Sequence, residues 1–116
     1  MPNPHAGEVE VLVDGVPRTA KLTLGALAEL ESRLGGDTLI ALVGRFEAGD
    51  VSSRDVLALL VAGLRGGGWA VTEADLLTAE IAGGPLGAVK AAAELLARAF
   101  QVPGQVPGQI PGQVPA

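Results

Sequence analysis

Glu8 to Val13 reads EVEVLV, and this stretch decides the fold class. Its valines stand at every second position, so an extended chain presents them on one side and the glutamates on the other. Asp14-Gly15 follows, a dipeptide that favours the positive φ angles of a two-residue hairpin turn. Polar and apolar residues alternate again from Arg18 to Leu24. The sequence therefore predicts a β-hairpin over residues 8–23 with one apolar face.

The hairpin needs a helical partner, because two strands alone are marginally stable in water. Apolar residues with helical spacing, bounded by capping residues and glycines, predict five helices in the rest of the chain. We expect them at about residues 24–34, 38–48, 53–65, 73–82 and 85–100. A chain of 116 residues fits one domain. The predicted fold is a single α+β domain over residues 8–100, in which the hairpin packs on a bundle of about five short helices.

Local signals mark the ends and faces of these helices. Ser52 with Asp55 and Thr72 with Asp75 have the spacing of capping boxes, and Thr23 is expected to cap the first helix. The last helix has the clearest apolar periodicity. Its expected buried face consists of Leu86, Val89, Ala93, Leu96 and Phe100.

The two ends of the chain differ from this domain. Residues 1–7 are expected to be a flexible N-terminus. Gln101 to Ala116 reads QVPGQVPGQIPGQVPA, a low-complexity repeat. Proline at every fourth position forbids a helix, and the repeat has no core to offset the entropy of ordering it. We predict a disordered tail over residues 101–116.

Composition excludes several classes of protein. The formal net charge is −5 and no basic cluster occurs, which disfavours binding to nucleic acid or to anionic lipid. The longest apolar stretch, Val56 to Leu64, is shorter than the about 20 residues that span a bilayer. The N-terminus does not read as a secretory signal, so we expect a cytoplasmic protein. The absence of cysteine excludes disulfides and thiolate metal sites.

The sequence offers no convincing catalytic, cofactor-binding or metal-binding residues. His5 is the only histidine, and Ser52 and Ser53 precede a helix, where capping is the better explanation. Acidic residues are scattered, and those at helix starts suit the helix dipole. A small hydrolase is therefore the least favoured function, since it needs a polar pocket with convergent titratable groups.

Gly66, Gly67, Gly68 and Trp69 form the candidate partner-binding segment. A phosphate-binding role for the glycines is disfavoured because they follow a helix rather than a strand, so we interpret them as a helix breaker. Trp69 either fills the core, the favoured alternative, or anchors a partner. The chain has more apolar side chains than about 90 residues can cover. We therefore expect the functional surface to be an exposed apolar patch shared among helices.

Three segments carry a resemblance to a known family. They are Asn3-Pro4-His5 with Gly7-Glu8-Val9, LTLGALAELE at residues 22–31 and GLRGGG at residues 63–68. In their order and spacing they resemble the gene transfer agent family of small phage-type tail proteins, which includes tail tube and tail assembly chaperone proteins.

The resemblance implies a non-enzymatic assembly factor that binds the tape measure protein and tail tube protein. It supplies no catalytic residues. A structural component that stays in the finished particle is the main alternative, and weak homo-oligomerisation is left open.

Overall fold

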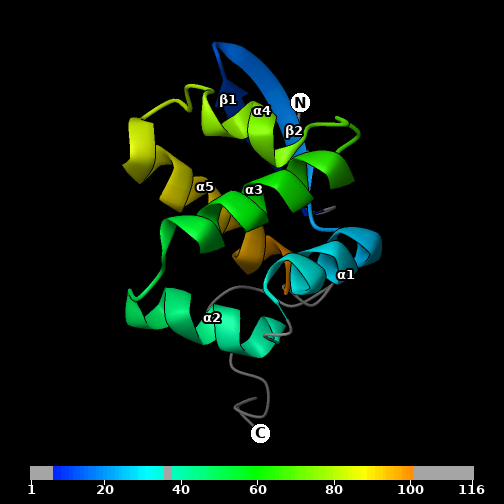
Figure 1. Cartoon of the computed structure of the whole chain (residues 1–116), viewed down its shortest axis with the longest axis vertical. Helices are drawn as coiled ribbons and strands as arrows, with labels where there is room; N and C mark the ends of the chain where they lie inside the picture. Colours follow the sequence, from blue (N-terminus) through cyan, green and yellow to red (C-terminus); the bar gives the residue numbers. More distant parts are fainter. Residues whose placement is uncertain (1–6, 36–37, 101–116) are drawn as a thin grey trace, which may run out of the picture.

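Over the residues that the structure describes, the architecture is a two-stranded antiparallel sheet followed by five helices (Figure 1). The structure is a computed structural model that describes residues 7–35 and 38–100. This order confirms the predicted α+β class, whereas the predictions for residues 1–6 and for the tail 101–116 lie outside the described residues. The elements are β1 (Glu8–Val13), β2 (Val16–Lys21), α1 (Leu24–Arg33), α2 (Leu39–Ala48), α3 (Ser53–Gly66), α4 (Glu73–Leu77) and α5 (Gly84–Ala99).

The hairpin turn has the predicted geometry. Asp14 and Gly15 both have positive φ, at 51° and 80°, as a type I′ turn requires. This turn fixes the register in which Val9 lies opposite Ala20 and Val13 lies opposite Val16. The three valines of β1 are buried, and so is Ala20. One face of the hairpin therefore contributes to the core, as the alternation in the sequence predicts.

Helix α3 is the centre of the fold. Figure 1 shows it between α1, α4 and α5, with the hairpin toward one end of the molecule and α2 at the other. It packs against β2 and against those three helices. From Asp55 to Leu64 all its residues except Leu57 are buried, which is why this segment is apolar on every side. The other elements are arranged around it.

The end of α3 covers the outer edge of β2. A Cβ atom on Gly66 would lie 2.0 Å from the Lys21 carbonyl oxygen, and one on Gly67 would lie 1.9 Å from that of Thr19. Real Cβ atoms do not come so close, so only glycine permits this packing. An uncovered edge strand exposes unpaired backbone groups to other chains. The two glycines thus bring the helix end directly against the edge.

Residues 80–82 cover the turn end of β1. The Asp14 N–H donates to the Glu80 carbonyl oxygen at 2.7 Å, and the Ala82 N–H donates to that of Leu12 at 3.1 Å. Ile81 forms a bridge with Val13 between them. The prediction of a helix over residues 73–82 is therefore wrong at its C-terminal end, because α4 ends at Leu77. Residues 80–82 form backbone hydrogen bonds with β1 instead.

The buried face of α5 also differs from the prediction. Ala92, Leu95 and Leu96 are the buried residues, whereas Leu86 is 65% exposed and Phe100 is 49% exposed. Ala93 is exposed as well, while Val89 and Leu96 contact the core as expected. Lys90 and Glu94 stand one turn apart and are exposed, whereas Arg98, one turn further on, is half-buried. The helix is therefore rotated relative to the predicted stripe.

Candidate interaction surface

Three of the four predicted partner-binding residues form the end of α3 and its turn. Gly66 is the last residue of α3, and Gly68 has a φ of 109° that reverses the chain. The helix-breaker interpretation is confirmed. The close approach that Gly66 and Gly67 allow is made by β2 of the same chain. The structure thus gives these two glycines an internal role, and their binding of a partner stays a prediction.

Trp69 lies half-buried against the core, which is the favoured alternative of the sequence analysis. The Arg18 guanidinium carbon lies 4.0 Å from the centroid of its ring, a cation–π distance. Arg18 Nε is buried and makes no hydrogen bond, so the ring is the contact that this cation has there. The pair fastens the loop after α3 to β2. The contact gives Trp69 a packing role, and its binding of a partner stays a prediction.

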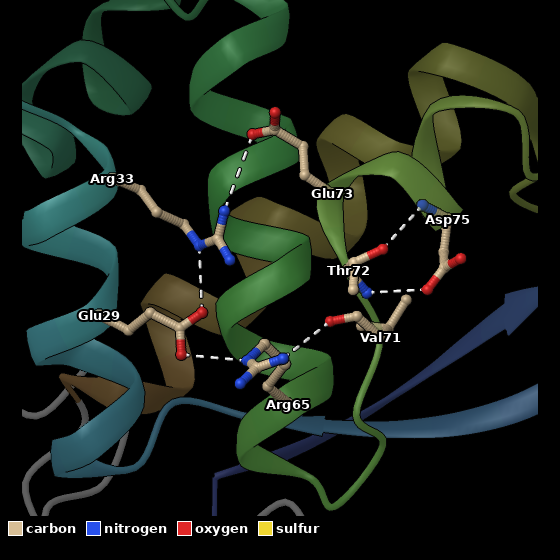
Figure 2. Close-up of polar contacts among 7 residues, drawn as sticks. All are labelled: Glu29, Arg33, Arg65, Val71, Thr72, Glu73 and Asp75. Carbon is tan, nitrogen blue, oxygen red and sulfur yellow. Dashed lines mark hydrogen bonds and ion pairs between the residues drawn. The ribbon is translucent and has the colours of Figure 1, made fainter.

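A network of ion pairs joins α1, α3 and α4 (Figure 2). Glu29 accepts one hydrogen bond from Arg33 Nε and one from Arg65 Nε, both at 3.1 Å. Arg33 also lies 3.8 Å from the Glu73 carboxylate, and Arg65 Nη1 donates to the Val71 carbonyl oxygen at 3.1 Å. Each charge is satisfied by another within the network. The network holds these three helices together.

Both predicted capping boxes are confirmed. Thr72 and Asp75 exchange hydrogen bonds at the start of α4, as Figure 2 shows. Hydrogen bonds from the Thr72 backbone and side chain lower the pKa of Asp75. Ser52 accepts from the Asp55 N–H at 3.1 Å at the start of α3. The capping interpretation of Ser52 therefore holds.

Asp55 also forms an ion pair with Arg45. Arg45 Nε and Nη2 each donate to one Asp55 oxygen at 3.0 Å, which fastens α2 to α3 through a two-pronged contact. Burial raises the pKa of Asp55, but hydrogen bonds from Arg45 and the Ser52 backbone N–H, with the Arg45 charge, outweigh that effect. The pKa of this carboxyl is lowered as a result, so it remains ionised near neutral pH.

A groove with apolar walls opens between α3, α4 and α5. It has a volume of about 560 Å³. Its deepest residues, Val56, Leu60 and Leu76, are buried, while Leu77 on its rim is 66% exposed. Other walls come from Val51, Leu57, Ile81, Pro85, Ala88 and Val89, and the polar residues Ser52, Ser53 and Arg54 lie at one end. We name this feature the α3–α5 groove.

Arg54 distinguishes the polar end of the α3–α5 groove. Among the arginines of residues 7–35 and 38–100, it alone has no ion pair, hydrogen bond or aromatic contact. Its side chain is exposed where the groove meets a second hollow of about 700 Å³ that reaches Arg33. An open apolar surface with an unused cation beside it is suited to binding an amphipathic partner.

The described residues contain no group of three or more His, Cys, Asp or Glu side chains able to hold a metal ion. None of the helices within residues 7–35 and 38–100 is both long and apolar enough to cross a bilayer. His5 lies outside the described residues.

The α3–α5 groove was not predicted from the sequence. An apolar patch shared among helices was expected, but the candidate partner-binding segment was placed at residues 66–69. The groove combines residues 51–60 with residues 76–89, so only the folded chain brings its walls together. Leu77 carried no signal that separates it from a core residue, because neighbouring leucines can both be buried, as Leu95 and Leu96 are in α5.

The family of the chain follows from one comparison. A family model described as "Phage tail tube protein, GTA-gp10" matches residues 6–102. The match confirms the resemblance that the three sequence segments carry. No curated protein and no solved structure matches the chain. Because the family match covers most of its length, the chain belongs to the GTA-gp10 family of phage tail tube proteins, a family of gene transfer agent tails.

Proposed function

We propose that this tail protein is a non-enzymatic assembly factor, which binds the tape measure protein or tail tube subunits while a gene transfer agent tail is built. Family membership supplies the tail context. The observation that carries the binding role is the α3–α5 groove, where Leu77 is 66% exposed and Leu57 and Val89 are half-buried. Contiguous exposed apolar surface of this kind usually marks a partner site.

The polar groups support a binding role rather than a catalytic one. Glu29, Arg33, Arg65 and Glu73 neutralise one another, and Arg45 pairs with Asp55. Charged side chains do line the hollow that contains Arg33, Asp50 and Glu73, but most of them are engaged in ion pairs that hold helices together. We further propose that the protein acts in the cytoplasm of the producing cell and without binding DNA.

Capture from producing cells tests the proposal. An affinity-tagged chain should retain the tape measure protein or the tail tube subunit in amounts comparable to the bait, as measured by quantitative mass spectrometry. A tagged unrelated acidic protein of similar size is the control. Recovery of no tail protein above that control would refute the binding role.

A lasting structural component of the tail is the second candidate, because the family description itself names a tail tube protein. The two candidates differ in what finished particles contain. A tube component should be present at many copies per purified particle, whereas an assembly factor should be absent or present in traces. Counting copies of this chain against the major tail proteins in purified particles decides between them.

A further inference from the structure

We propose that the α3–α5 groove binds an amphipathic helix of a tail protein partner, with a carboxylate of that helix paired to Arg54. The inference rests on the proposed function and names the surface and the chemistry of the partner. It starts from the groove between the first turns of α3, the end of α4 and the start of α5.

The walls of the groove determine the backbone conformation of its occupant. They come mainly from helices, whose backbone groups are already hydrogen-bonded within each helix, and they present mostly aliphatic side chains. An extended peptide would find no strand edge there and would bury unpaired N–H and C=O groups. A helix satisfies its own backbone and can lay an apolar stripe along Leu57, Leu77 and Val89. The groove therefore selects a helix.

Arg54 sets the charge of the occupant. It lies at the polar end of the groove and has no partner among the described residues, unlike Arg45, which pairs with Asp55 nearby. An acidic side chain at the matching end of the bound helix would pair with it as the rim loses water. An acidic residue beside an apolar stripe is thus the expected signature in the partner's sequence.

This chemistry disfavours the chain's own C-terminal segment as the occupant. Residues 101–116 contain proline at every fourth position and no Asp or Glu. They can neither form a helix nor supply a side-chain carboxylate for Arg54. A partner helix satisfies both requirements.

Peptide binding tests the inference directly. Overlapping peptides of about 20 residues, or roughly 30 Å of helix, cover the tape measure and tail tube proteins of the same tail. Binding to the full chain is measured by fluorescence polarisation. We expect the tightest peptides to be helical when bound, with apolar residues at i, i+3, i+4 and i+7 and an acidic residue at one end. The matching full-length partner is measured in parallel.

Three variants locate the binding surface. Leu77→Ser should weaken the tightest peptide by about tenfold or more, because it removes an exposed apolar contact without opening the core. Leu24→Ser is its matched control, since Leu24 is 83% exposed at the start of α1 and lies outside the groove. Arg54→Glu should weaken binding, and replacing the acidic peptide residue by Lys should restore it. The recovery would identify the ion pair.

Each remaining result counts against the inference. Unchanged affinity in Leu77→Ser and Arg54→Glu, with the wild type binding its full-length partner, would overturn the groove and leave the proposed function standing. Tighter peptide binding after deletion of residues 101–116 would indicate that this segment, and not a partner helix, occupies the groove. If the wild type forms a dimer and Leu77→Ser dissociates it, the groove would be an interface between two copies of this chain. Failure of the wild type to bind any tail protein would refute the proposed function and the groove with it.

Discussion

Replacing Gly66 by Ala tests how closely α3 must approach β2. The new Cβ would lie 2.0 Å from the Lys21 carbonyl oxygen, whereas ordinary contacts begin at 3.4 Å. Either α3 or β2 must therefore move. Overpacking of this kind lowers the free energy of unfolding by about 3 kcal/mol, whereas the better helix propensity of Ala raises it by about 1 kcal/mol. We expect a net loss of about 2 kcal/mol in the free energy of unfolding, or roughly 8–16 °C in melting temperature.

Gly44→Ala provides the matched control. Gly44 also lies within a helix, but a Cβ there would meet no atom within 4 Å. This variant should gain about 0.5–1 kcal/mol from helix propensity alone. Thermal unfolding followed by circular dichroism measures both proteins against the wild type. If Gly66→Ala were as stable as Gly44→Ala, the contact between α3 and β2 would not limit the fold, and the reasoning would fail.

Four further predictions can be tested with the same protein. Asp55→Asn should lower the free energy of unfolding by about 2 kcal/mol at pH 7, because it breaks a largely buried ion pair with Arg45. The pKa of Asp55 is lower in the folded protein than in the unfolded chain. The stability difference between wild type and Asp55→Asn should therefore be fully present above the unfolded-state pKa and shrink as the pH falls through the folded-state pKa. Equal urea midpoints for the two proteins at pH 7 would contradict this prediction. Trp69→Ala should cost about 2 kcal/mol from lost packing and cation–π contact. Unchanged stability with lost capture of a tail protein would instead support the segment Gly66 to Trp69 as the partner site. Deleting residues 101–116 should leave the melting temperature within about two degrees, and a larger drop in a thermal scan would show that the tail packs on the domain. The purified protein, with its net charge of −5, should not shift DNA in a gel at near-physiological salt, where a shift would reject this prediction.

Features fixed by local interactions were predictable from the sequence. Asp14-Gly15 has its type I′ turn because both residues tolerate positive φ. The boxes at Ser52 and Thr72 each close over three residues, so spacing alone identifies them. The hairpin follows from the alternation in β1 and needs no distant information. These elements account for the correct fold class.

Features that depend on contacts between distant residues could not be predicted from the sequence. Residues 80–82 leave the predicted helix because Leu12 and Asp14 offer backbone partners about 66 positions earlier in the chain. The rotation of α5 could have been inferred from Lys90 and Glu94, whose spacing marks a solvent-facing side. The abundance of Ala and Leu around the rest of that helix concealed it. The α3–α5 groove depends on how three helices dock, which periodicity within each helix does not encode.

The contact between the α3 glycines and β2 also sets the order of events during synthesis. Lys21 leaves the ribosome 45 residues before Gly66, its neighbour in the folded protein. Because synthesis adds about 5–20 residues per second, roughly 2–9 s pass between the emergence of the hairpin and that of the helix end that covers its edge. An isolated hairpin is marginal during that interval. The edge of β2 is therefore covered late, and a nascent chain interrupted before Gly66 would present an open strand edge to other chains.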